Sequence, residues 1–312
     1  MRRPAPVLLI ALIVVGTGVG ALSQDAQVFR AESELVVLHV NVFDDRSDAV
    51  PELPQTAFQV IENGKPQDIR FFSSEDVPVA AGLIIDNSGS MIARHRMVRA
   101  GSLAFVTASH PEDELFTIMF NNEVLYGLPD RVAFSNSEAL LRAAVARYPA
   151  GGKTALYDAV IAGLDHVERG THQKHVLVVL SDGDDNASRH SEDEMFDRVR
   201  RSDAIIYVVS NADRRVGYAG RPGLLKKLAD LGGGVAYFPK SEDEVVRSLR
   251  EVAENIRRGY SIGYSPAKTA GVTPGDEDFR RVTVTVRAPG RGKLNVRSRS
   301  GYFLSHSDSG AQ

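Results

Sequence analysis

The period with which hydrophobic and polar residues alternate changes along the chain. Residues 34–44 follow the two-residue period of a half-buried β-strand. From about residue 77 to residue 258, short apolar runs are separated by stretches with helical periodicity. After residue 259 the chain returns to strand-like runs. Strands that alternate with helices form a mostly parallel sheet covered on both faces, so we expect an α/β domain between two β segments.

The middle region contains enough elements for a doubly wound fold. Each predicted strand is followed by a stretch that can form a right-handed helical crossover, which favours a mainly parallel sheet. The predicted strands are 79–85, 115–120, 176–180, 204–209 and 235–238, and the predicted helices are 93–108, 137–147, 155–167, 192–201, 223–231 and 242–257.

The flanking β segments are too short to fold well alone. About 50 strand-rich residues lie on each side of the α/β region, and a piece of that size buries only a marginal core. We therefore expect them to form one β-sandwich into which the α/β domain is inserted; the alternative is two independent β modules. The predicted boundaries are 24–76 and 259–304 for the β segments, 77–258 for the α/β domain and 305–312 for a tail.

Turn residues mark hairpins in these segments. Asn63 and Gly64, which both tolerate positive φ, lie between the apolar runs 58–62 and 68–72 and predict a hairpin of those two strands. The C-terminal segment predicts strands at 260–264, 281–287 and 293–297.

The N-terminus has the pattern of an export signal. Two arginines precede an apolar run at residues 7–15, and small residues then lead to a cleavage site after Ser23. We expect residues 1–23 to be a signal peptide, which directs the protein to the periplasm, the cell envelope or the outside of the cell. An uncleaved membrane anchor is the alternative, because the apolar stretch extended to Leu22 approaches the length of a membrane span.

Composition excludes several classes of function. The chain has 312 residues, 43% of them hydrophobic, which is enough for about two domains with real cores. A net charge of −3 gives no basic surface for nucleic acid. The absence of cysteine excludes disulfides, thiolate zinc sites and a cysteine nucleophile. No Walker A loop, nucleophile elbow or His-Glu-x-x-His helix is present, so nucleotide binding and hydrolase chemistry lack a motif.

Three loops carry oxygen ligands that could meet at one metal ion. Asp86, Ser88 and Ser90 follow a buried strand, and hard oxygen donors of this kind suit Mg²⁺ or Mn²⁺. By themselves they could equally form a turn and cap the next helix. Thr154, in a glycine-rich loop before a helix, and Asp182, at the end of a second buried strand, extend the set. Ligands bind at such carboxyl ends of parallel strands, which favours a common site.

With these five residues in this order, the chain resembles the von Willebrand factor type A domain and its metal-ion-dependent adhesion site (MIDAS). It also resembles a bacterial family of von Willebrand factor type A-related proteins, first delineated in acidobacteria, over nearly all of the mature chain. The segments that carry this resemblance are 58–64, 86–91, 154–159, 181–183, 259–264 and 299–302.

The resemblance implies roles for particular residues. Ser88 and Ser90 would bind the ion directly, and Asp86, Thr154 and Asp182 would bind it directly or through water. The ion would be Mg²⁺, with Mn²⁺ or Ca²⁺ as alternatives. Two further residues could support the site. Lys153 could attract an acidic ligand or be a solvated surface lysine, and Asp158 could orient the loop or lie on a solvated helix face.

Three functional hypotheses follow. The first is an exported, non-enzymatic binding protein whose ion captures the Asp or Glu carboxylate of a protein partner. The second is a structural envelope protein in which the metal only stabilises loops. The third is a metal-assisted hydrolase, which needs a general base near the ion; His110 and Glu112 are expected at the opposite end of the sheet.

Overall fold

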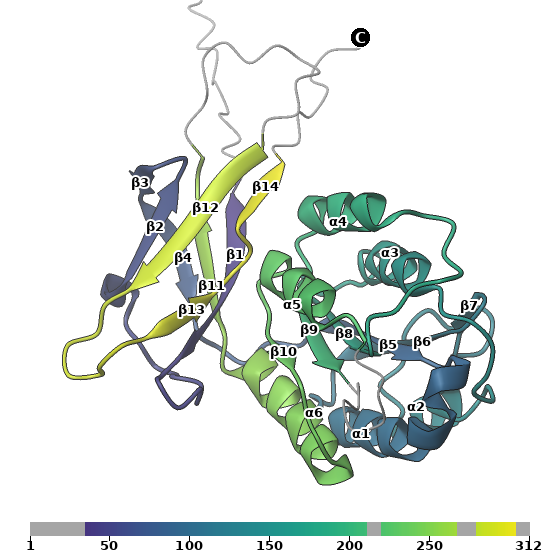
Figure 1. The fold of residues 1–312 in the computed structure, drawn as a ribbon. Coiled ribbons are helices and arrows are strands. Elements are labelled where there is room, and N and C mark those ends of the chain that lie inside the picture. Colours follow the sequence, from purple (N-terminus) through teal and green to yellow (C-terminus); the bar gives the residue numbers. More distant parts are fainter. Residues whose placement is uncertain (1–34, 211–219, 267–278, 304–312) are drawn as a thin grey trace, which may run out of the picture. The chain divides into compact units, whose positions relative to one another are not determined.

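The computed structural model describes residues 35–210, 220–266 and 279–303 (Figure 1). The predicted signal peptide at 1–23 and the predicted tail at 305–312 lie outside the described residues. Within the described part, no helix has both the length and the apolar character needed to cross a membrane.

The central sheet has six strands in the order β10-β9-β8-β5-β6-β7. All neighbouring strands are parallel except β6 and β7. The strands are β5 (Ala80–Asp86), β6 (Glu114–Phe120), β7 (Val124–Tyr126), β8 (His175–Ser181), β9 (Ile205–Ser210) and β10 (Ala236–Tyr237).

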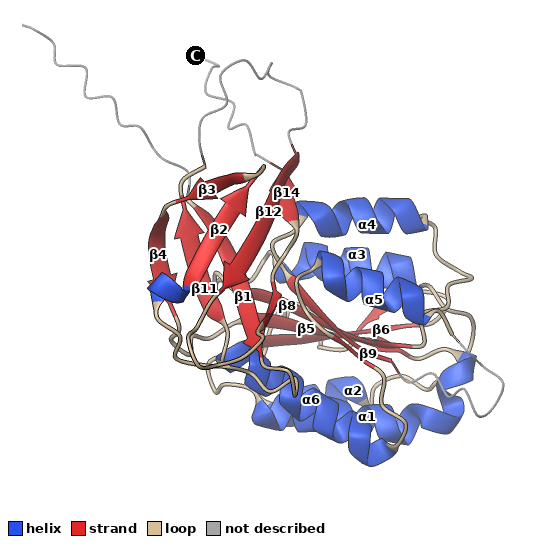
Figure 2. Cartoon of the chain, turned by 60° about the vertical axis from the view of Figure 1, so that its left-hand side comes forward, coloured by secondary structure: helices blue, strands red, loops and turns tan. Residues whose placement is uncertain are grey.

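Helices cover both faces of this sheet. In Figure 2, α1, α2 and α6 lie on one face, and α3, α4 and α5 lie on the other. The helices are α1 (His95–Ala108), α2 (Glu138–Val145), α3 (Leu156–Val167), α4 (Glu192–Arg201), α5 (Pro222–Leu231) and α6 (Glu242–Arg257), with a 3-10 helix η2 (Gly89–Arg94) ahead of α1. The middle of β5 is buried on both sides, as a parallel strand between two helical layers requires.

Local signals set several helix starts. The Ser191 side chain accepts a hydrogen bond from the Glu194 backbone, and the Glu194 side chain accepts from the Ser191 backbone, which completes a capping box at α4. At α6 the Ser241 side chain accepts a hydrogen bond from the Glu244 backbone, which caps the helix without a capping box. These two helices have the bounds that the periodicity predicts.

The flanking strands form two antiparallel four-stranded sheets, each built from both ends of the chain. Their orders are β13-β1-β11-β4 and β14-β12-β2-β3. The predicted fold class, a doubly wound α/β domain inserted in a β-sandwich, is therefore confirmed. The strands are β1 (Val36–Phe43), β2 (Phe58–Glu62), β3 (Lys65–Gln67), β4 (Ile69–Ser73), β11 (Tyr260–Tyr264), β12 (Phe279–Val286), β13 (Asn295–Arg297) and β14 (Gly301–Phe303), and a short 3-10 helix η1 (Gln55–Ala57) precedes β2.

The predicted hairpin around Asn63 and Gly64 differs from the observed one. The turn is present, with positive φ at both residues, but it joins β2 to the short strand β3. After Gln67 the chain passes into the other sheet, where β4 pairs with β11 instead of β2. A sandwich buries its core between two sheets. The strand-like pattern of 68–72 does not specify which of the two sheets contains this strand.

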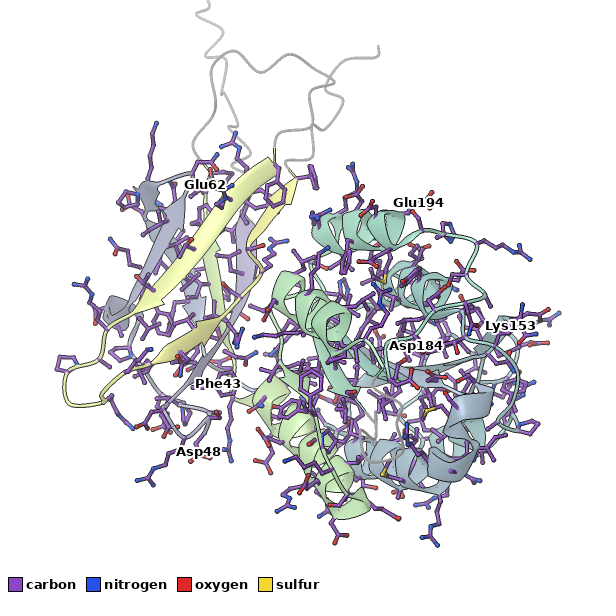
Figure 3. The ribbon with its side chains drawn as sticks, in the orientation of Figure 1. Phe43, Asp48, Glu62, Lys153, Asp184 and Glu194 are labelled. Carbon is purple, nitrogen blue, oxygen red and sulfur yellow. The ribbon has the colours of Figure 1, made fainter. Side chains whose placement is uncertain are left out.

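A buried polar cluster joins the N-terminal and C-terminal parts of the sandwich. Glu62 on β2 accepts a hydrogen bond from Arg280 on β12, with 2.8 Å between Oε1 and Nη1. Its other oxygen accepts from the hydroxyls of Tyr264 and Tyr302, at 2.7 and 2.8 Å. Burial raises the pKa of both tyrosines, so they remain donors. Glu62 is labelled at the sandwich in Figure 3.

We expect Glu62→Ala to lower the free energy of unfolding by about 3–5 kcal/mol, because it removes the carboxylate that a buried arginine and two buried hydroxyls share. Urea unfolding followed by circular dichroism measures this loss. The control is Arg70→Ala, which breaks an exposed pair with Asp68 at 3.8 Å and should change the stability by about 0.5 kcal/mol or less. A loss of less than about 1 kcal/mol for Glu62→Ala would show that the cluster does not hold the sandwich together.

Candidate metal centre

The parallel pairing of β5 with β8 brings two predicted loops together. Ile85 lies opposite Leu180 in this pairing, so Asp86 and Ser181 are the next residues along their strands. On its other side β5 pairs with β6, where Asp86 lies opposite Phe120. Both candidate loops therefore begin at the carboxyl edge of the sheet, where doubly wound folds bind ligands.

A chain of hydrogen bonds connects four of the five predicted ligands. Asp86 Oδ1 accepts from the Ser88 backbone at 3.0 Å, and Asp86 Oδ2 accepts from the Ser181 hydroxyl at 2.9 Å. The hydroxyl oxygens of Ser88 and Ser90 are 3.1 Å apart. The Ser90 hydroxyl donates to Asp182 Oδ2 at 3.2 Å. The structure thus brings Asp86, Ser88, Ser90 and Asp182 to one place, although their role as metal ligands stays a prediction.

The two carboxylates are buried at an electrostatic cost. Burial raises the pKa of Asp86 to about 6; hydrogen bonds from Ser88 oppose the rise, and the charge of Asp182 adds to it. Burial also raises the pKa of Asp182, although the Arg94 guanidinium partly offsets this. Among the described residues, neither carboxylate forms a salt bridge.

A divalent cation would remove this cost, and the donors fit one. Carboxylate and hydroxyl oxygens are hard ligands of the kind that Mg²⁺, Mn²⁺ and Ca²⁺ prefer. The set contains two carboxylates, and within the described ranges no group of three His, Cys, Asp or Glu side chains could hold a metal. A site built this way leaves much of its coordination to neutral oxygens.

The third predicted loop lies against the first. The Gly89 backbone donates to the Gly152 carbonyl at 2.9 Å, and the Gly151 backbone donates to the Asn87 carbonyl at 2.8 Å. Thr154 is buried, and its backbone donates to Asn186 Oδ1 at 2.9 Å. Its hydroxyl makes no hydrogen bond to the four connected side chains, so the structure brings this residue to the site only through its loop.

Position 152 has no room for a side chain. Its φ is +87°, a value that side chains disfavour, and a Cβ at this position would lie 2.4 Å from Asn122 Oδ1. The same Asn122 oxygen accepts a hydrogen bond from the Lys153 backbone at 2.6 Å. A larger residue at position 152 would therefore disturb the loop that carries Thr154.

The two predicted supporting residues lie in different surroundings. Asp158 on α3 accepts hydrogen bonds from the backbones of Arg189 and His190, each at 3.0 Å, and from the His190 ring at 2.8 Å. Burial would raise the pKa of Asp158, but these donors lower it. Asp158 therefore orients the loop after Asp182. Lys153 is exposed at the periphery of the α/β domain (Figure 3).

Several polar residues that support the site were not predicted from the sequence. Ser181 accepts from the Gly183 backbone at 3.0 Å as well as donating to Asp86. Asn87 donates to the Pro149 carbonyl at 2.7 Å, and Asp185 accepts from the Tyr157 backbone at 3.2 Å. Their position beside the predicted ligands in sequence was the available signal, but their partners are distant in the chain.

No protein-family model matches the chain, and no curated protein matches it in sequence. Solved structures do match it. A von Willebrand factor type A protein from Catenulispora acidiphila has a TM-score of 0.52 and 12% identity, with 87% of this chain and 75% of that chain covered. Proximal thread matrix protein 1 from the mussel byssus has a TM-score of 0.50 and 16% identity, with 64% and 51% covered.

The mussel protein is also known with zinc in its MIDAS motif. That structure has a TM-score of 0.50 and 15% identity, and the match covers 64% of this chain and 50% of that one. The chain therefore spans about half the length of the mussel protein. At these identities the likeness concerns the fold, and it agrees with the topology described above: the chain contains a von Willebrand factor type A fold.

Proposed function

We propose that this chain is an exported binding protein whose metal ion captures a carboxylate of a protein partner. The observation that carries the proposal is the connected set Asp86, Ser88, Ser90 and Asp182, in which two buried carboxylates lack a salt-bridge partner among the described residues. The predicted N-terminal signal supports export, and the fold supports a role in binding.

The donor set favours binding over a closed structural site. Two carboxylates and two hydroxyls fill only part of an octahedral shell, and neutral hydroxyls add no negative charge. An incoming Asp or Glu side chain would supply a missing ligand. When bound, the ion would supply electrostatic attraction for that carboxylate. Ser88, Ser90, Asp86, Asp182 and Thr154 would hold the ion and leave a position for the partner's carboxylate.

The structural and enzymatic alternatives differ in what they require. A purely structural ion would stabilise the loops without increasing affinity for a carboxylate. A hydrolase would need a general base beside the ion. His110 and Glu112 precede Glu114, which lies opposite Ala80 at the start of β5, so they are at the other end of the strand from Asp86, about 20 Å away.

The first test is calorimetric titration of the purified chain with Mg²⁺ and Mn²⁺. We expect the parent to bind and a Ser88→Ala, Ser90→Ala variant to bind at least about tenfold more weakly, because two hydroxyl ligands are lost. Ser74→Ala with Ser300→Ala is the matched control, since both serines are exposed and lie in the sandwich strands or their connections. Equal binding by parent and site variant would contradict the proposed ligands.

Excess acetate in the same titration distinguishes binding from a structural role. Metal and acetate should each increase the affinity for the other if the carboxylate completes the shell. Metal binding that acetate does not change would favour the structural alternative. Pull-down with and without chelator, repeated with the serine variant, would then identify or exclude a metal-dependent protein partner.

The buried charge of Asp86 predicts an unusual substitution effect. Asp86→Asn should abolish Mg²⁺ binding yet stabilise the metal-free protein by about 1 kcal/mol or more, because it removes a buried charge that lacks a cation. Thermal unfolding in metal-free buffer measures this gain. Asp113→Asn is the control: Asp113 is equally buried but pairs with Arg257, so its loss should destabilise the protein. If Asp86→Asn destabilised the metal-free protein as Asp113→Asn does, the carboxylate would be structural.

The raised pKa of Asp86 predicts how stability depends on pH. Because the pKa is about 6 in the folded protein, above its unfolded value, ionisation of this group destabilises the metal-free fold above about pH 6. That destabilisation is lost as the pH falls from about 6 to about 4. Mg²⁺ needs the ionised form, so the Mg²⁺-induced rise in melting temperature should be smaller at about pH 5 than at about pH 8. A rise of the same size at both pH values would argue against Asp86 as a ligand.

A further inference from the structure

A cavity of about 400 Å³ lies at the β7 edge of the α/β domain. It is bounded by β6, β7, the C-terminal half of α3 and the segment 128–133. Its volume is in the range of about 300–1,000 Å³ that small-molecule sites occupy. None of the residues predicted for the metal centre lines it, and its function is unassigned.

Aromatic rings form one wall of the cavity. The His166 ring on α3 lies 4.3 Å from the Phe116 ring and 5.3 Å from the Tyr126 ring, measured between centroids. Phe134 packs behind it at 5.0 Å. Such a wall suits a flat, apolar or aromatic group, because offset and tilted ring pairs are favourable.

His166 contributes to this wall as a neutral ring. Its Nε2 lies 2.8 Å from the Ala133 carbonyl, which can only accept, so Nε2 carries the hydrogen. Burial lowers the pKa of His166, which keeps the ring uncharged at neutral pH. The wall is therefore apolar in character although it contains a histidine.

Charged residues line the solvent-facing side of the cavity. Arg131 and Arg169 are exposed, and within the described residues neither has an acidic group within salt-bridge distance. Asp130 also lines the cavity. Two arginines and one aspartate give this side a net positive charge, which favours an anionic group.

The backbone at Arg131, beside the cavity, is strained. Arg131 has a φ of +71°, and the Val132 backbone donates to the Pro129 carbonyl at 3.0 Å, which closes a turn. A turn with positive φ at its third residue usually has glycine there. Arginine at this position costs about 1 kcal/mol, and strain of this kind often occurs at ligand-binding loops.

We propose that this cavity binds a small aromatic carboxylate. The ring lies against Phe116, Tyr126 and His166, and the carboxylate faces Arg131 and Arg169. The inference does not rest on the metal centre, because it uses different residues and no ion.

The test uses 2-naphthoate as the probe in metal-free buffer, so that the metal centre does not capture the carboxylate. Calorimetry and ligand-observed NMR measure binding to the full chain. Two variants remove one positive charge each: Arg131→Gly, which also relieves the strained φ, and Arg169→Gln. The control variant is Arg70→Gln, an exposed arginine on β4 that does not line the cavity.

We expect each cavity variant to weaken 2-naphthoate binding by about tenfold. Arg131→Gly should keep or raise the melting temperature, which separates lost binding from lost folding. Arg70→Gln should bind as the parent does. The neutral 2-naphthamide and the ring-free acetate should both bind more weakly than 2-naphthoate.

Three outcomes would overturn the proposal. One is no binding of 2-naphthoate at millimolar concentration. Another is equal affinity for 2-naphthamide, which would show that the cavity binds apolar groups and does not recognise the negative charge of the carboxylate. The third is an equal loss in Arg70→Gln, which would show that attraction by net charge explains the binding.

Discussion

Parallel pairing of β5 with β8 is the interaction on which the candidate metal centre depends. It places Asp86 beside Ser181, the last residue of β8, and Asp182 follows directly in the chain. The loops 86–90 and 181–184 therefore start side by side, and the hydrogen bond from Ser90 to Asp182 connects them. A shift of one residue in this pairing would turn these side chains to the opposite face of the sheet.

The same geometry creates an energetic conflict inside the protein. Asp86 and Asp182 are fully buried; burial raises the pKa of each carboxyl group, and the charge of Asp182 adds to the rise at Asp86. Elsewhere the chain satisfies buried carboxylates: Glu62 has Arg280 and two tyrosines, and Asp113 has Arg257. Conflicts of this kind are expected where a sequence gives up stability for function. This contrast is the physical reason to propose a cation for the two carboxylates that form no salt bridge within the described part of the chain.

Much of the fold could be predicted because its signals are local. The capping serines Ser191 and Ser241 define α4 and α6, and buried runs define β5 and β8. The prediction that failed concerns which strands pair with each other. The run 68–72 is strand-like, but its place in the second sheet depends on β11, some 190 residues later. Strand β7 is only three residues long and has no period of its own. For the site, the sequence motifs predicted residues that the structure brings together, whereas the hydrogen bond from Ser181 to Asp86 requires knowledge of the strand pairing.

The two candidate sites differ in how visible they are in a sequence, and the difference has a structural cause. The candidate metal centre is built from two strand ends and a loop before a helix, so its residues fall in short sequence motifs, one in each loop. The cavity is built from side chains on β6, β7, α3 and the turn at Pro129–Val132, which no motif connects. Only the tertiary fold brings Phe116 beside His166 or places Arg131 and Arg169 along one opening. The most unusual local feature of the cavity is an arginine, Arg131, at a turn position that favours glycine. The sequence does not show this feature, because the positive φ is known only from the backbone.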